Sequence, residues 1–111
     1  MTTNGSVTLY HKMDEGYKRE YLPDVWRYIQ KAGVIDAGGL STGNAMSNGD
    51  IMKLRIPDTS ISVKKGDVVV DGDCERDIAN LRDLRGIDYY VINTVAYNLY
   101  GNNQHIRAEA I

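Results

Sequence analysis

The sequence has no phenylalanine, one cysteine, two prolines and no long apolar run. The single cysteine, Cys74, excludes an intramolecular disulfide, which is typical of proteins in a reducing compartment. No apolar run approaches the roughly 18 residues of a membrane-spanning helix, so the sequence predicts none. The first residues lack a basic start followed by an apolar stretch, which argues against a signal peptide. These absences together predict a soluble intracellular product with no membrane partner.

No charge of one sign dominates either. Thirteen basic residues stand against fifteen acidic ones, for a net charge of -2 and an isoelectric point near 5.6. Bulk electrostatics therefore favours neither nucleic acid nor an anionic membrane surface. The length of 111 residues suits one domain, which we place at residues 1–111. Eight tyrosines and one tryptophan supply the aromatic surface, and tyrosine suits half-buried sheet positions and interfaces.

Period-two alternation of apolar and polar residues dominates the chain and predicts β-strands. The clearest case is 6–13, where Val7, Leu9, His11 and Met13 share one face. Pro23 interrupts the returning strand and predicts a bulge or corner, because proline has no N–H for the ladder. The other predicted strands are 25–32, 50–57, 60–64, 68–70, 87–98 and 105–111. We therefore predict a mainly β protein, a small and partly open barrel of about six or seven strands.

One short α-helix is predicted at about 74–85. Asp73 suits the N-cap and Gly86 follows the end. Within the segment Ile78, Leu81 and Leu84 recur every third residue, which gives a narrow apolar stripe that suits packing on a sheet.

A long glycine-rich loop is predicted at 36–49, inside the stretch 33–50 that carries five glycines and two asparagines. Connections between packed strands usually have about 2–6 residues, so this one is unusually long. Loops of this length are commonly either functional or disordered, and the sequence leaves both open.

The stretch KKGDVVVDGDCERD at 64–77 has the acidic alternation of a calcium loop. Counted from Asp71, the sixth position holds Arg76 and the twelfth holds Arg82, where an EF-hand needs glycine and glutamate. The stretch is therefore interpreted as a strand between two glycine turns, followed by an acidic helix start.

No set of residues predicts catalysis, a cofactor or a metal. The glycines of GGLSTGNA at 38–45 have the separation of a phosphate-binding loop, but Asn44 stands where the lysine belongs. Cys74 has two histidines as possible bases, His11 and His105, and neither lies at a short spacing from it. We therefore expect a protein that is not an enzyme.

The segments LYHK, RIP, KGDVVVDG and HIRAE occur in this order along the chain. With this layout, about residues 6–110 resemble a family of small tailed-phage and prophage proteins encoded among the head–tail connection genes. A more distant resemblance is to the head-completion, or stopper, proteins of long-tailed phages.

The resemblance implies a homo-oligomeric ring in the virion, at the head–tail junction, assembled from protein made in the host cytoplasm. Its partners would be portal or adaptor proteins and tail proteins, and double-stranded DNA would pass without sequence-specific binding. In stopper proteins a long loop between early strands helps to plug the channel. The corresponding residues here are Gly38, Gly39, Gly43, Asn44 and Asn48.

Two surfaces are candidates for contacts between subunits of such a ring. One is the strand surface that carries Tyr10, Tyr17 and Tyr21. The other is the last strand, with His105, Arg107 and Ile111, which we expect to pair with a neighbour's edge.

Two alternatives stay open. The nearer one is another small tail or minor capsid component, because many such proteins share small barrels. The other is a bacterial β-barrel module that binds a peptide or ligand, which an exposed aromatic groove would favour.

Overall fold

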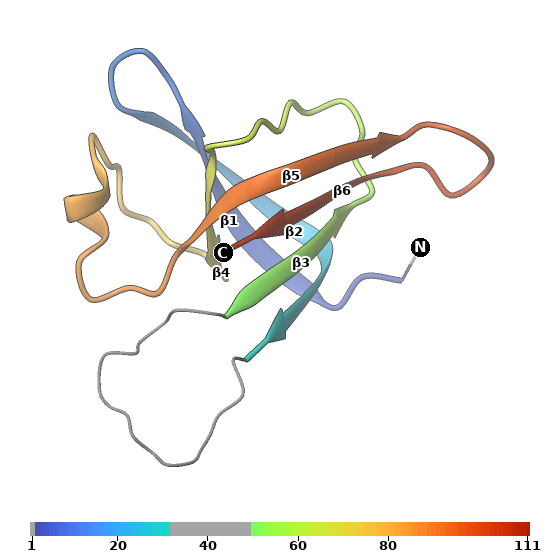
Figure 1. Ribbon diagram of the computed structural model, residues 1–111, viewed down its shortest axis with the longest axis horizontal. Coiled ribbons are helices and arrows are strands. Elements are labelled where there is room, and N and C mark those ends of the chain that lie inside the picture. Colours follow the sequence, from blue (N-terminus) through green and yellow to red (C-terminus); the bar gives the residue numbers. More distant parts are fainter. Residues whose placement is uncertain (1, 32–49) are drawn as a thin grey trace.

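The computed structural model describes residues 2–31 and 50–111, so the predicted loop 36–49 and its residues lie outside the described part. The described chain is mainly β, as predicted (Figure 1). Its strands are β1 Gly5–Lys12, β2 Tyr17–Gln30, β3 Ile51–Ile56, β4 Val68–Asp71, β5 Tyr90–Asn98 and β6 His105–Ala110.

The strands form a closed barrel in the order β1-β2-β3-β6-β5-β4, and every neighbouring pair is antiparallel. The expected strand alternation is confirmed in β3, where Met52, Leu54 and Ile56 are buried. Two details of the prediction were wrong. The barrel is closed rather than partly open, because β4 pairs with β1, and residues 60–64 form no strand.

The long strand β2 carries the predicted irregularity at Pro23. Val7 of β1 lies opposite Leu22, whereas Gly5 lies opposite Val25. Two steps along β1 therefore match three along β2, which is the geometry of a β-bulge. The extra residue falls where proline removes a backbone donor, so the bulge bends β2 at a place where the ladder is already interrupted.

The three valines of β4 are buried on both faces of the strand. Val69 belongs to the apolar cluster inside the barrel. Val68 and Val70 point outward and join Tyr10 in a second cluster. This cluster lies under residues 72–89, which we name the cover segment. Because both faces of β4 pack against apolar layers, its buried residues form a continuous run of valines. Gly66 precedes the strand and Gly72 follows it, with φ angles of 99° and 86° that suit glycine.

The predicted α-helix at about 74–85 was wrong. The only helix in the described residues of this region is a 3-10 helix, Leu81–Leu84, with Asn80 as its cap. Backbone groups of this segment are instead bonded to side chains of the barrel. Thr8 Oγ1 accepts the Cys74 N–H, and the Tyr10 hydroxyl donates to the Arg76 carbonyl. Arg19 pairs with Asp73, the predicted N-cap, at 2.6 Å.

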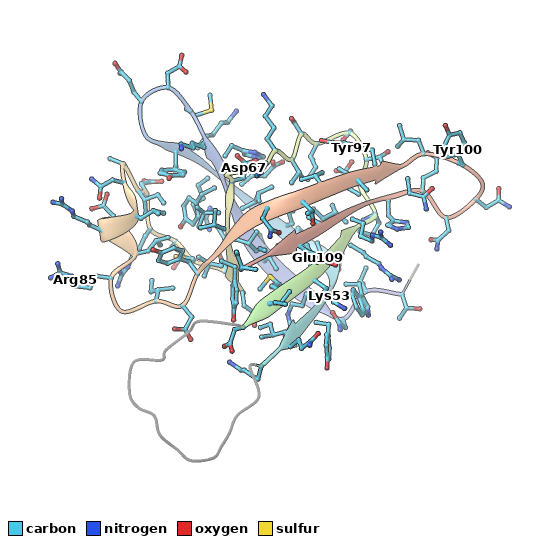
Figure 2. All side chains as sticks on the ribbon, viewed as in Figure 1. Lys53, Asp67, Arg85, Tyr97, Tyr100 and Glu109 are labelled. Carbon is cyan, nitrogen blue, oxygen red and sulfur yellow. The ribbon has the colours of Figure 1, made fainter. Side chains whose placement is uncertain are left out.

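The β5–β6 hairpin projects from the barrel and carries Tyr100 at its tip (Figure 2). Tyr100 is 86% exposed. Nearer the barrel, the Tyr97 hydroxyl accepts the Val63 N–H and donates to the Val63 carbonyl. This pair of bonds attaches the connection between β3 and β4 to strand β5.

The Tyr10 hydroxyl joins β1 to the cover segment. Burial, and then its hydrogen bond to Cys74, raise the pKa of Tyr10 well above the ordinary value. Tyr10→Phe would leave the Arg76 carbonyl without its donor. We expect a loss of about 1–2 kcal/mol in the free energy of unfolding, measured by urea denaturation.

Tyr28→Phe is the matched control, because Tyr28 is 51% exposed. We expect this control to change the free energy of unfolding by less than about 0.5 kcal/mol. Equal urea midpoints for the two variants would contradict the role of the Tyr10 hydroxyl.

The cover segment has its own pH-dependent bonds. The Asp83 carboxylate accepts the N–H groups of Ala79 and Asn80, which lowers the pKa of Asp83 below its ordinary value of 3.8. Since the folded pKa is the lower one, these bonds stabilise the fold above the unfolded pKa and are lost as pH falls through the folded pKa. In an NMR titration, the two amide signals should move together with a midpoint below 3.8. Asp83→Asn should abolish that titration, and a midpoint above 3.8 would refute the assignment.

Candidate functional site

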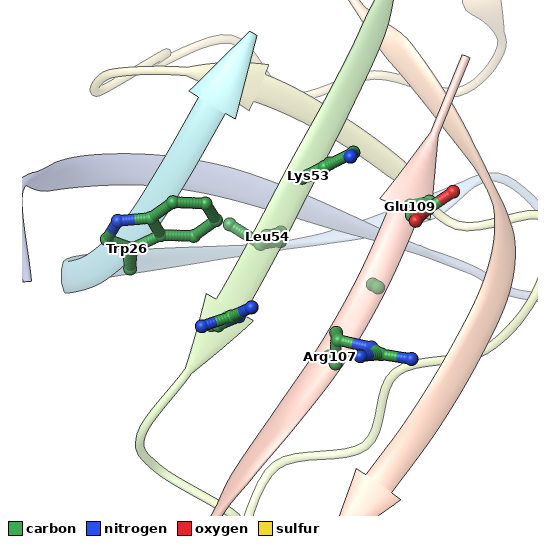
Figure 3. Close-up of a pocket in the computed structure, with 7 residues that line it drawn as sticks. Trp26, Lys53, Leu54, Arg107 and Glu109 are labelled. Carbon is green, nitrogen blue, oxygen red and sulfur yellow. The ribbon is translucent and has the colours of Figure 1, made fainter. Parts of the chain in front are cut away.

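An aromatic and basic surface lies on the outside of β2, β3 and β6 (Figure 3). We name it the aromatic–basic face and define it by Trp26, Tyr28, Lys53, Arg55 and Arg107. Strand pairing places its residues in two rows across the sheet. Trp26 lies opposite Arg55, which lies opposite Arg107. Tyr28 lies opposite Lys53, which lies opposite Glu109.

The aromatic side of the face is ordered by ring contacts. The rings of Trp26 and Tyr28 stack with centroids 6.5 Å apart and planes inclined by 21°. The Arg55 guanidinium lies over the Trp26 ring, 4.9 Å from its centroid. Such a cation–π contact holds the guanidinium against a flat apolar surface while its N–H donors stay free for other partners.

The charges of this face are not neutralised by neighbouring side chains. Arg55 and Arg107 lie directly opposite each other, an arrangement that costs stability in a sheet. Within the described residues, neither they nor Lys53 take part in an ion pair. By contrast, Arg19 is paired with Asp73 and Arg27 with Asp71, both at 2.6 Å. Two unpaired guanidiniums side by side offer a site for an anionic group.

A pocket of about 160 Å³ opens between the two rows of the face. Its lining consists of Trp26, Lys53, Leu54, Arg55, Arg107, Ala108 and Glu109. The rim is charged, and the floor is formed where strand residues Leu54 and Ala108 lie, whose side chains belong to the barrel core. The arrangement suits a carboxylate or a small acidic segment that packs against Trp26.

The predicted tyrosine surface is only partly present. Tyr10 is fully buried in the second cluster, so its assignment to a subunit interface was wrong. Tyr17 is half-buried against that same cluster. Tyr21 is 39% exposed and stays a possible contact residue. Tyr10 lies inside because the cover segment supplies a second apolar layer that strand alternation does not reveal.

The predicted edge pairing through the last strand was also wrong. β6 is bonded to β3 on one side and to β5 on the other, so it has no free edge. His105 is buried, and its Nδ1 lies 2.8 Å from the Asn103 carbonyl oxygen. Arg107 is exposed and belongs to the aromatic–basic face. Ile111 is 60% exposed, although its backbone pairs with Val91.

The structure does not bring Cys74 into hydrogen-bonding contact with either histidine. Cys74 is buried and accepts a hydrogen bond from Tyr10, with Oη and Sγ 3.2 Å apart. His11 Nε2 lies 2.7 Å from Glu20, as expected for a hydrogen-bonded structural histidine. In the described part of the chain no three or more His, Cys, Asp or Glu side chains gather in a metal-binding arrangement.

No sequence pattern indicates the role of Asp67. Its side chain is buried and accepts the N–H groups of Lys12 and Lys64, both at 2.9 Å. His11 Nδ1 lies 3.5 Å from the same carboxylate. All of these partners of the Asp67 carboxylate belong to the chain itself, and the carboxylate holds the turn before β4 against β1. We therefore interpret His11 and Asp67 as structural.

The family described as a family of unknown function, DUF6751, matches residues 1–111. No curated protein and no solved structure matches the chain. Separately, the described residues contain no helix with the length and apolar character to cross a membrane.

The repulsion between Arg55 and Arg107 predicts that the face is not optimised for stability. Arg107→Glu would place opposite charges across the strand pair, and we expect the free energy of unfolding to rise by about 0.2–1 kcal/mol. Urea denaturation at low salt measures the gain, and high salt should reduce it because the pair is exposed. Arg107→Gln should give a smaller gain. A destabilising Arg107→Glu would show that the arginine already has a favourable partner.

Proposed function

The chain belongs to DUF6751, a family of unknown function, and we propose that it is a structural subunit of a phage virion. Its place is the head–tail junction, in the connector ring that closes the DNA channel after packaging. The resemblance of the ordered segments LYHK, RIP, KGDVVVDG and HIRAE to head–tail connection proteins supports this. The small closed barrel, with its longest connection between β2 and β3, suits such a subunit.

The observation that carries the proposal is the aromatic–basic face. The last strand of the barrel, β6, is paired on both sides, so the contact between copies that we propose uses side-chain surfaces rather than the edge of that strand. Aromatic residues and arginine are enriched in protein interfaces, and this face combines Trp26 and Tyr28 with Arg55 and Arg107. The unpaired charges of Arg55 and Arg107 suit a contact in which the partner supplies the carboxylates.

The sequence of the connection between β2 and β3 suits a channel wall. Residues 36–49 contain no lysine or arginine. A wall past which DNA slides should not hold phosphates, because each neutralised phosphate adds binding free energy. This segment is therefore assigned to the channel, with portal or adaptor proteins above the ring and tail proteins below it.

The gene and the particle test the proposal. We expect portal, major capsid and tail genes within a few kilobases of this gene. In particles from the phage or prophage that carries it, mass spectrometry should detect the chain, and electron cryomicroscopy should place the barrel in the neck. Deletion of the gene should give filled heads that lose their DNA.

Particles that lack the chain, or metabolic and regulatory genes as neighbours, would refute the virion role. The same images separate the connector from the nearer alternative. Density in the tail or in the capsid shell, with none in the neck, would assign the chain to another tail or minor capsid component.

A second candidate function is supported by the pocket beside Trp26. An exposed aromatic groove with two unpaired arginines suits a module that binds an acidic peptide. Titration of the intact chain with a short polyglutamate peptide, followed by Trp26 fluorescence, separates the two functions. Saturable micromolar binding would favour the peptide-binding module, and a linear, unsaturated response would favour the virion subunit.

A further inference from the structure

The cover segment carries the charge that the aromatic–basic face lacks. Residues 72–89 contain five acidic residues, Asp73, Glu75, Asp77, Asp83 and Asp88, and three basic ones, Arg76, Arg82 and Arg85. The difference is a net charge of -2. The rows of the face contain Lys53, Arg55, Arg107 and Glu109, for a net charge of +2. The face and the cover segment therefore carry net charges of opposite sign.

Two carboxylates at the start of the cover segment are available for a partner. Asp73 is paired with Arg19, and Asp83 accepts backbone N–H groups of the segment itself. Glu75 and Asp77 are exposed, and neither forms an ion pair with another described residue. These two side chains match the two unpaired guanidiniums of the face in number and in charge.

The two surfaces lie on opposite sides of the barrel. The cover segment packs on the outside of β1 and β4, against Tyr10, Val68 and Val70. In the closed order β1-β2-β3-β6-β5-β4, the strands opposite β1 and β4 are β6 and β3, which carry the face. Figure 2 shows Arg85 of the cover segment well separated from Lys53 and Glu109. One copy therefore cannot satisfy its own face with its own cover segment.

We propose that the aromatic–basic face of one copy docks onto the cover segment of the next copy, with Arg55 and Arg107 binding the carboxylates of Glu75 and Asp77. This inference deepens the proposed function, because it names the contact between neighbouring subunits of the ring. Different patches meet in such a contact, so the association is head-to-tail and forms a ring when the rotation between copies closes.

A second copy fits this face better than a nucleic acid does. Glu109 lies within the row that contains Lys53, and its carboxylate would repel a run of phosphates. When the partner is a second copy, the Glu109 carboxylate faces a cover segment that also contains three arginines, which offer it an opposite charge. A mixed pattern of charges is typical of specific protein contacts, whereas nucleic-acid surfaces concentrate one sign.

Two charge-reversal variants of the full chain test the contact. The face variant is Arg55→Glu with Arg107→Glu, and the cover variant is Glu75→Lys with Asp77→Lys. Each keeps one intact surface, so neither should associate with itself. Mixed together, the intact face of the cover variant should bind the intact cover of the face variant. The product should contain the two variants in a 1:1 ratio, and it can extend because the reversed face and the reversed cover also carry opposite charges.

The readout is NMR of the ¹⁵N-labelled cover variant, with the Trp26 indole N–H as reporter. Unlabelled face variant should shift this signal saturably at up to millimolar concentration. Unlabelled cover variant should bind at least about tenfold more weakly, because like charges then meet. The matched control is a variant with Lys18→Glu and Lys65→Glu, which has the charge change of the face variant at other exposed sites. We expect this control to bind the wild-type chain no more weakly than the wild-type chain binds itself.

No shift of the Trp26 signal at millimolar face variant would overturn the proposal. So would an equal response to both unlabelled variants, which would mean that the charges do not direct the contact. Urea unfolding of each variant confirms that it is folded before mixing.

The outcome is separable from that of the proposed function. Particles that contain the chain in the neck and assemble normally with the face variant would remove the contact and leave the virion role. A 1:1 product in solution with no chain in the particles would keep the contact and remove the virion role.

Discussion

The pairing of β4 with β1 is the constraint on which the rest of the structure depends. It closes the barrel, and it leaves the three valines of β4 with apolar side chains on both faces of one short strand. The inner valine is covered by the barrel core. The outer two would stay in water unless another layer covered them, at a cost of roughly 1.5–3 kcal/mol for each exposed side chain. The cover segment is that layer.

The cover segment is held by polar bonds as well as by apolar contact. Thr8, Tyr10 and Arg19 bond to its backbone, all from the β1–β2 hairpin. Two of these bonds take the carbonyl groups of Cys74 and Arg76, which an α-helix over 74–85 would pair within itself. The segment therefore becomes an extended chain that ends in a single 3-10 turn, with its carboxylates turned to solvent. The barrel side chains thus decide both the conformation and the outward charge of this segment.

Closure has a second consequence on the far side of the barrel. Because β6 is paired with both β3 and β5, it cannot add a strand from a neighbour, and the proposed contact uses side chains. The pairing of β3 with β2 and β6 gathers Trp26, Arg55 and Arg107 in one row. The row is stacked and ordered but uncompensated in charge. A subunit with this basic face on one side and an acidic cover segment on the other can associate head-to-tail with further copies of itself.

The sequence by itself determined the strands, because side-chain alternation of period two reports which face of a strand is buried. That pattern placed β3, β5 and β6 within a few residues, located the bulge at Pro23, and identified VVV as a strand between glycine turns. It predicted a mainly β barrel for the same reason, since several alternating strands must share one apolar interior.

Only the tertiary structure decided what lies beside what. Alternation cannot show that a residue on the outer face of a strand is covered by another layer. It therefore predicts Tyr10 at the surface, whereas Tyr10 is buried in the second cluster. Local periodicity favoured a helix at 74–85, but bonds from distant residues of β1 and β2 outweighed it. The aromatic–basic face joins residues 26, 55 and 107, which are far apart in sequence and meet only through strand pairing. Sequence carries the pattern within each strand, whereas the register between strands is a property of the closed barrel.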